Sequence, residues 1–235
     1  MKKFIHSIIL IIKATLQLKK YNIGIYILLR FILDIFFIYI VNKIKYKKIN
    51  IIFFNHCKKK LNISFNWFGN NAQIWFFFFK KFQLFNKKIS ILEIGSFEGL
   101  SINYYYKFLN NIDVTSVDPL DKSTKYFKNF KRNTKNLKNF NFFNINAKQF
   151  FKKKYNKKYD LIYIDSSHLY KDVLFEGKES LKLLNKGGIL IFDDLLHSRE
   201  NYEYKNVIGG IILFLNLVRN IKIHYIGHQL IIQKI

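Results

Sequence analysis

Short apolar runs alternate with longer, partly polar stretches along the chain from Lys88 onward. The apolar runs predict strands, which we place at residues 89–94, 112–117, 140–145, 159–164 and 188–192. The stretches between them are long enough for helices, at residues 98–109, 121–133, 147–155 and 169–184. Strands that alternate with helices imply right-handed crossovers and a parallel sheet that is covered on both faces.

The carboxyl-terminal end departs from this alternation. Residues 221–226 and 229–234 are two apolar runs that are separated only by Gly227 and His228. So short a connection cannot hold a crossover, and the two runs must form an antiparallel hairpin. The expected fold class is therefore α/β, a doubly wound sheet that is mostly parallel and ends in an antiparallel hairpin.

The first 60 residues form a separate, apolar and helical extension before a domain that we place at residues 61–235. The window 23–41 is long enough to cross a bilayer, but it contains Arg30 and Asp34. Each charge costs roughly 2.5–3.5 kcal/mol at the centre of a membrane helix, a cost that pairing at i,i+4 lowers without removing it. Three interpretations stay open for residues 1–50: packing on the domain or on a second subunit, membrane attachment, and a targeting segment without a clear cleavage site.

The strongly basic composition does not by itself assign the chain to a class of function. The formal net charge of +25 is typical of proteins that bind nucleic acid or an anionic membrane. The lysines are spread along the whole chain, however, in a sequence that is rich in Asn, Ile and Phe, so we interpret them as solvated faces and keep nucleic acid as the alternative. Cys57 is the only cysteine, which excludes an internal disulfide and fits a reducing compartment such as the cytoplasm.

The turn after the first strand, ILEIGSFEGLS at residues 91–101, lies where a doubly wound sheet binds nucleotides. A dinucleotide fold would have G-x-G-x-x-G here, whereas this turn has Phe97 and Glu98 between Gly95 and Gly99. A carboxylate at a helix amino terminus competes with phosphate for the same positive dipole end. Asp118 ends the second strand, where it can accept hydrogen bonds from a ribose. The turn therefore favours an adenosyl ligand without phosphates.

Carboxylates also follow the fourth and fifth strands. Asp165 ends one, and Asp193 and Asp194 end the other, so all three are expected at the carboxyl edge of the sheet. Three carboxylates would repel one another without a cation, and oxygen ligands favour Mg²⁺. The alternative is that Asp193 or Asp194 caps the next helix and Asp165 only contacts the cofactor.

At these residues the sequence resembles the class I S-adenosylmethionine-dependent methyltransferases, which have a Rossmann-like fold. The resemblance covers about residues 65–235 and rests on residues 93–99, on Val117-Asp118-Pro119 and on the terminal hairpin. Residues 159–173 and 183–196 look more narrowly like the macrocin-type sugar O-methyltransferases, with catechol O-methyltransferase more distant. The resemblance implies S-adenosylmethionine as cofactor, with contacts at Glu93, Gly95, Ser96, Gly99, Asp118, Ala147, Gln149 and Asp165. It also implies Mg²⁺ ligands at Asp165, Asp193 and Asp194, and a catalytic base at His168, with His197 in reserve.

Pro119 is the only proline, which excludes the Pro-Pro motif of amino-methylating enzymes and the Pro-Cys nucleophile of cytosine C5 enzymes. We therefore expect Mg²⁺-dependent O-methylation of a hydroxyl on a small molecule, such as a sugar. Two alternatives are kept: a methyltransferase that binds nucleic acid, and a membrane-attached, non-catalytic scaffold.

Overall fold

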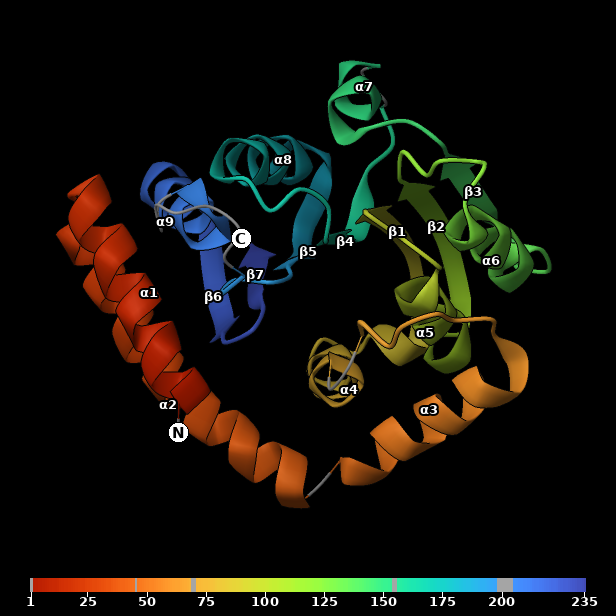
Figure 1. Ribbon diagram of the computed structural model, residues 1–235, viewed down its shortest axis with the longest axis horizontal. Helices are drawn as coiled ribbons and strands as arrows, with labels where there is room; N and C mark the ends of the chain where they lie inside the picture. The colour runs from red at the N-terminus through yellow and green to blue at the C-terminus, as the bar shows by residue number, and fades with distance from the viewer. Residues whose placement is uncertain (1, 45, 69–70, 154–155, 198–204) are drawn as a thin grey trace. The chain divides into compact units, whose positions relative to one another are not determined.

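The computed structural model describes residues 2–44, 46–68, 71–153, 156–197 and 205–235 (Figure 1). The helices are α1 (Lys2–Leu18), α2 (Tyr21–Ile44), α3 (Lys47–Lys60), α4 (Asn71–Lys81), the 3₁₀ turn η1 (Leu84–Asn86), α5 (Leu100–Phe108), α6 (Lys125–Thr134), α7 (Ala147–Lys152), α8 (Tyr170–Leu183) and α9 (Val207–Leu217). The strands are β1 (Lys88–Ile94), β2 (Asn111–Val117), β3 (Phe140–Phe143), β4 (Tyr159–Ile164), β5 (Leu184–Phe192), β6 (Ile221–Ile226) and β7 (Leu230–Lys234).

In the part of the chain that the structure describes, seven strands form one sheet in the order β3-β2-β1-β4-β5-β7-β6. The pairs β1/β2, β2/β3 and β4/β5 are parallel, whereas β7 is antiparallel to both β5 and β6. This confirms the expected fold class. The chain divides into two compact units, one of Met1–Phe36 with Tyr155–Ile235 and one of Phe37–Lys154, which are described separately below.

The second unit, Phe37–Lys154, is built around aromatic packing behind β1–β3. Trp75 of α4 is fully buried and stacks on Tyr105 of α5, with ring centroids 5.4 Å apart and planes 8° from parallel. Phe68 meets the edge of the same indole at 4.8 Å. Helix α4 was not predicted, because its sequence NAQIWFFFFKK is apolar without a clear helical period.

The first unit, Met1–Phe36 with Tyr155–Ile235, contains β4–β7 with α8 and α9. Gly177 of α8 lets this helix approach closely, because a Cβ there would lie 2.7 Å from Phe192 of β5 and 2.9 Å from Phe214 of α9. Helix α9 was not predicted either. Its sequence VIGGIILFLNL has two adjacent glycines. At one of them, Gly210, an added Cβ would lie 2.7 Å from the Tyr170 carbonyl oxygen, so a larger residue would not fit.

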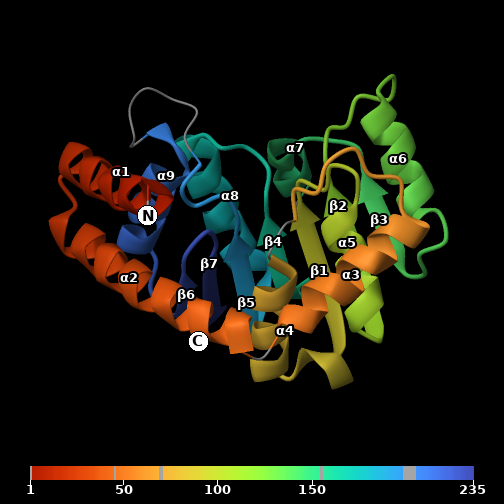
Figure 2. The same cartoon turned by 60° about the horizontal axis from the view of Figure 1, so that its bottom comes forward.

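Helix α1 and α2 up to Phe36 belong to the first unit, where α1 packs on α9, and Figure 2 shows the two helices side by side next to α9 and β6. Arg30 and Asp34 form an ion pair with N···O 3.1 Å, and the Asp34 carboxylate accepts the backbone N–H of Ile226 at 2.9 Å. This carboxylate therefore satisfies an N–H of the outermost strand of the sheet, which explains why an acid interrupts an apolar helix. No helix among the described residues is long and apolar enough to cross a membrane.

Candidate functional site

The turn between β1 and α5 is wrapped around the Asp118 side chain in the second unit. Gly95, Phe97 and Gly99 all have left-handed backbone angles, with φ of 87°, 44° and 79°. Asp118 Oδ2 accepts the backbone N–H of Ser96 at 2.6 Å and that of Phe97 at 2.8 Å. Burial raises the pKa of Asp118, and these two hydrogen bonds oppose the rise. The carboxylate thus fixes the shape of the turn from the end of the neighbouring strand.

Two further acids of this turn are directed into the protein. Glu93 is fully buried, accepts the Ser101 hydroxyl at 2.7 Å, and has a pKa that burial raises to about 8. Glu98 is also buried and accepts the backbone N–H of Ser64 and the side-chain amide of Asn129, each at 2.7 Å. From the sequence, the Glu98 carboxylate was expected to compete with a phosphate for the helix amino terminus. Its carboxylate instead ties the turn to α6 and to the segment before α4.

Two other expected cofactor residues, Ser96 and Gln149, form hydrogen bonds within the protein. The buried Ser96 hydroxyl lies 2.5 Å from the Ser116 hydroxyl. Ala147 begins α7, and Gln149 completes a capping box in which its side chain and that of Asn146 each accept the other's backbone N–H. The structure therefore gathers Ser96 and Phe97 around Asp118, whereas Gln149 bonds to its own helix cap.

In the first unit, Asp165 and Asp193 meet at the carboxyl ends of β4 and β5. The Tyr163 hydroxyl lies within hydrogen-bond distance of both carboxylates, at 3.2 Å from Asp165 Oδ2. Asp193 also accepts the Gln229 side-chain amide at 2.9 Å and the backbone N–H of Asp194 at 2.8 Å. Burial raises the pKa of Asp193 to about 6, and the charge of Asp194 adds to the rise.

Asp194 turns away from Asp193 toward two histidines. It has a left-handed backbone with φ of 52°, and its Oδ2 lies 2.8 Å from His168 Nε2 and 3.8 Å from His197 Nδ1. The hydrogen bond from His168, followed by the charges of the nearby histidines, lowers the pKa of Asp194. One atom from each of these three side chains lies within 4.8 Å of the others, so they too could hold a metal ion.

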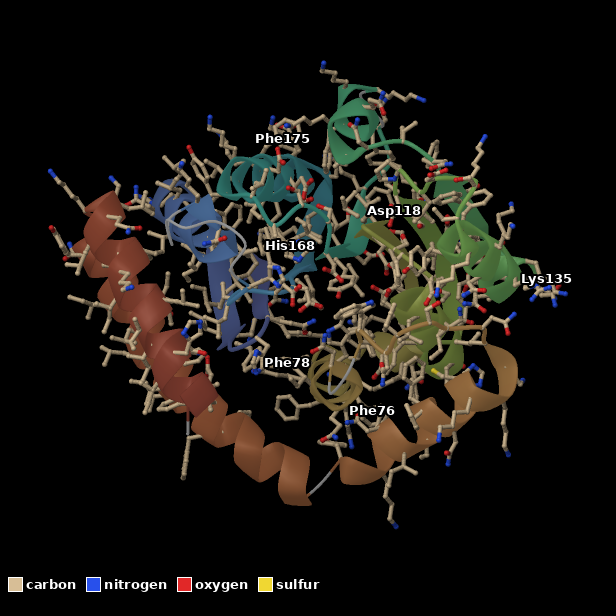
Figure 3. The ribbon with its side chains drawn as sticks, in the orientation of Figure 1. Phe76, Phe78, Asp118, Lys135, His168 and Phe175 are labelled. Carbon is tan, nitrogen blue, oxygen red and sulfur yellow. The ribbon has the colours of Figure 1, made fainter. Side chains whose placement is uncertain are left out.

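His168 lies just before α8 (Figure 3), and it borders a small crevice. The crevice is lined by Ile164, Asp165, Ser166, Ser167, His168, Val173, Phe192, Asp193 and Val207. The Ser167 hydroxyl donates to Asp172 at 2.8 Å, which anchors the turn that carries His168. His168 Nδ1 is buried and has no hydrogen-bond partner in the described part of the chain. The second ring nitrogen is therefore an unsatisfied polar atom in the wall of the crevice.

Sequence reasoning missed two residues that organise this crevice. Tyr163 was interpreted only as part of an apolar strand, although it shares a strand face with Asp165, two residues later, and this was the available signal. Gln229 comes from the terminal hairpin and reaches Asp193 across 36 residues of sequence. Nothing in the sequence indicates that pairing.

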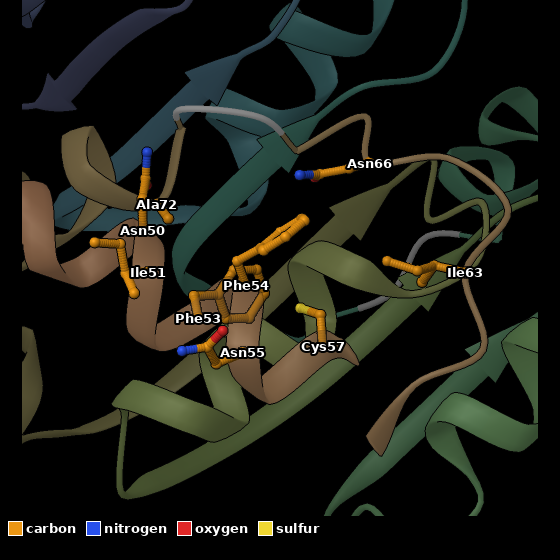
Figure 4. Close-up of a pocket in the computed structure, with 9 residues that line it drawn as sticks. All are labelled: Asn50, Ile51, Phe53, Phe54, Asn55, Cys57, Ile63, Asn66 and Ala72. Carbon is orange, nitrogen blue, oxygen red and sulfur yellow. The ribbon is translucent and has the colours of Figure 1, made fainter. Parts of the chain in front are cut away.

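A larger cavity of about 370 Å³ lies within the second unit (Figure 4). It is lined by Asn50, Ile51, Phe53, Phe54, Asn55, Cys57, Ile63, Asn66 and Ala72. Burial raises the pKa of the Cys57 thiol to about 12, so the thiolate is scarce at neutral pH and the residue is a poor nucleophile. The cavity has no other group with acid–base chemistry near neutrality.

Comparison with known proteins finds a family that part of the chain matches. Residues 92–195 match the family described as a methyltransferase domain. The chain carries a methyltransferase domain. Apart from the reserve base His197, every site residue expected from the sequence lies within the matched range. No curated protein matches the sequence.

Solved structures show that this methyltransferase domain has the class I fold. The MycE methyltransferase of mycinamycin biosynthesis, in complex with Mg, SAH and mycinamycin VI, is similar with a TM-score of 0.59 and 14% identity over 77% of this chain, which spans 53% of MycE. An O-methyltransferase from Bacillus cereus, in complex with SAH, has a TM-score of 0.54 and 15% identity over 88% of this chain and 100% of its own. A Clostridium thermocellum protein described as an rRNA methylase has a TM-score of 0.54 and 14% identity over 74% of this chain and 100% of its own. At these identities the likeness establishes the fold, and the methyl acceptor has to be argued from the site.

Proposed function

We propose that this methyltransferase transfers a methyl group from S-adenosylmethionine to a hydroxyl oxygen of a small molecule, such as a sugar, with Mg²⁺ assistance. The observation that carries the proposal is the crevice that brings a carboxylate pair, Asp165 and Asp193, together with a histidine held by Asp194. A neutral alcohol is a poor nucleophile. Methyl transfer to a hydroxyl is therefore helped by a cation that lowers the pKa of the hydroxyl and by a general base that accepts its proton.

The turn around Asp118 fits an adenosyl cofactor, which when bound supplies the electrophilic methyl group. Oδ2 of Asp118 holds the turn, which leaves Oδ1 as the acceptor for ribose hydroxyls. Phe97 stands where a dinucleotide turn has glycine, so its side chain occupies the approach that a pyrophosphate would need. Glu93 acts through Ser101 to position the start of α5 and is a positioning residue, since its side chain is fully buried.

Asp165 and Asp193 would hold Mg²⁺, and Asp194, whose Oδ2 bonds to His168, would add its Oδ1. The fit is supported by the Tyr163 hydroxyl, since a single oxygen atom already reaches both Asp165 and Asp193. The donor set is all oxygen, as Mg²⁺ prefers. Burial and the charge of Asp194 raise the pKa of Asp193, and a bound cation would stabilise its ionised form. Bound there, Mg²⁺ would lower the pKa of an acceptor hydroxyl and orient it.

His168 is the proposed general base, and its hydrogen bonds identify the reacting atom. Asp194 has a lowered pKa and is ionised at neutral pH, so it accepts the proton that His168 carries on Nε2. In the neutral imidazole this leaves Nδ1 without a proton. Nδ1 is also the nitrogen without a partner among the described residues. We therefore assign proton acceptance from the substrate hydroxyl to Nδ1.

A nucleic-acid acceptor is the second candidate, favoured by the net charge of +25 and by the likeness to an rRNA methylase. The chemistry of the crevice favours a small hydroxyl compound over this candidate. Its polar groups are two carboxylates, two serines and a histidine, and carboxylates would repel a phosphate backbone.

The acceptor class is tested with S-adenosylmethionine that carries a labelled methyl group. The full-length protein is incubated with Mg²⁺ and either sugar-containing compounds, catechol-like compounds or total RNA. The proposal expects label in an ether-linked methyl group of a small molecule. Label recovered in RNA or in protein, with none in the hydroxyl compounds, would identify the acceptor class as macromolecular.

A further inference from the structure

The two amino-terminal helices present an apolar face that the first unit does not cover. On α1 and the first four turns of α2, one side is buried, including Ile11, Ala14, Ile27 and Phe31. The opposite side is exposed over twelve large apolar residues: Phe4, Ile5, Ile9, Ile12, Leu16, Tyr21, Ile25, Tyr26, Leu29, Ile32, Leu33 and Phe36. We call these twelve residues the outer face. Within it Leu29, Leu33 and Phe36 are 58%, 65% and 68% exposed.

The outer face is held in place as part of the folded unit. Helices α1 and α2 approach closely at Gly24, where a Cβ would lie 2.1 Å from the Thr15 hydroxyl oxygen. The rings of Phe4 and Phe31 stack at 6.0 Å between the two helices. Asp34 ties α2 to β6 through Ile226. Because the inner side of each helix is committed to protein, only the outer side is available to a partner.

The charge of this region indicates the partner. Residues 1–36 contain six Lys and Arg residues and a single acid, Asp34. That acid pairs with Arg30 and accepts the N–H of Ile226, so the net positive charge of this region comes from its five lysines. Lys13 and Lys19 have exposed side chains on and after α1. A second copy of the chain would present the same positive charge, and like charges would oppose its docking.

We propose that the outer face binds the surface of an anionic lipid bilayer, with α1 and α2 lying in the plane of the headgroups. An apolar helix face next to basic residues is the combination that inserts into the boundary between headgroups and acyl chains. Anionic lipids then attract the basic residues, each of which contributes a roughly fivefold gain in affinity near the surface. The proposal is independent of the methyl acceptor, and it would place the enzyme where substrates in or near a membrane are concentrated.

The test is flotation of the full-length protein with lipid vesicles. We expect the protein to float with vesicles that contain phosphatidylserine, and to do so much less with phosphatidylcholine alone or at high salt. The variant Leu29→Ser/Leu33→Ser/Phe36→Ser should lose affinity by roughly 100-fold, because three exposed anchors are removed. The variant Lys13→Gln/Lys19→Gln/Lys20→Gln should lose roughly 100-fold on anionic vesicles only.

The matched controls are Trp67→Ser, which changes a side chain that is 71% exposed outside the outer face, and Leu217→Ser, at 56%. Both should bind vesicles like the unchanged protein. Circular dichroism and S-adenosylmethionine binding check that every variant is folded. The proposal is overturned if the protein fails to float, or if the controls lose as much affinity as the outer-face variant. A dimer in lipid-free solution that the outer-face variant dissociates would instead identify a second copy as the partner.

Discussion

Replacing Asp118 separates its two proposed tasks, which are shaping the turn and binding the ribose. In Asp118→Ala the N–H groups of Ser96 and Phe97 lose their acceptor. A hydrogen bond to a charged group contributes about 1.5–3 kcal/mol. Two such bonds, taken at the low end because Asp118 is only half-buried, predict a loss of about 3 kcal/mol in the free energy of unfolding.

Asp118→Asn is the matched variant, because its side-chain oxygen can still accept both N–H groups while its NH₂ replaces the oxygen that would face the ribose. We expect this variant to lose only about 1 kcal/mol of stability, the cost of making two charged hydrogen bonds neutral. Both variants should bind S-adenosylmethionine about 10- to 100-fold more weakly, since one hydrogen bond from the ligand to a charged acceptor is lost.

Denaturant unfolding and calorimetric titration measure these two quantities. If Asp118→Asn binds S-adenosylmethionine as tightly as the unchanged protein, Asp118 does not bind the ribose. If Asp118→Ala is fully stable, the turn does not depend on its carboxylate. Tighter binding of NAD than of S-adenosylmethionine by the unchanged protein would refute the cofactor assignment itself.

Three other substitutions test the framework around the site. Glu93 has a pKa raised to about 8, so between about pH 5 and 8 the folded state keeps the proton that the unfolded state loses. The free energy of unfolding should therefore fall as pH rises through this range. Glu93→Gln should remove this part of the pH dependence in denaturant titrations. Asp34→Ala should lower the free energy of unfolding by about 2–3 kcal/mol, because Ile226 N–H and the paired arginine lose their partner, whereas full stability would show the pair to be dispensable. Gly24→Ala should destabilise by about 1–3 kcal/mol through overlap with Thr15, and an unchanged melting temperature would mean that α1 and α2 are not packed as described.

The sheet was predictable from the sequence because its strands are buried on both faces. Runs such as Leu161–Ile164 are continuously apolar, and the Gly227-His228 connection leaves only a hairpin. The position of Asp165 just after β4 followed directly, since residues after parallel strands share one edge. The predicted bounds of β3, β5 and α7 differ from those in the structure by a few residues, because the ends of strands and helices are not sharply defined by the sequence pattern.

What the sequence could not provide were the pairings between distant residues. Arg30 and Asp34 were interpreted only as an i,i+4 pair, because the Ile226 N–H that Asp34 accepts lies 192 residues away. Helix α4 has no helical period in its four consecutive phenylalanines, and its burial against α5 depends on tertiary packing. The direction of Glu98 likewise depends on Ser64, which comes from a segment without a regular pattern.

The central claim, methyl transfer assisted by Mg²⁺ and by His168, is tested most directly by measuring methyl transfer to a hydroxyl acceptor that the labelling experiment identifies. We predict that EDTA abolishes turnover while S-adenosylmethionine binding is largely kept, and that added Mg²⁺ restores the rate. His168→Ala should lower the rate of the methyl-transfer step by roughly 10²–10⁴-fold, the usual contribution of a general base. A metal-free preparation that turns over at the full rate, or a fully active His168→Ala variant, would contradict the mechanism.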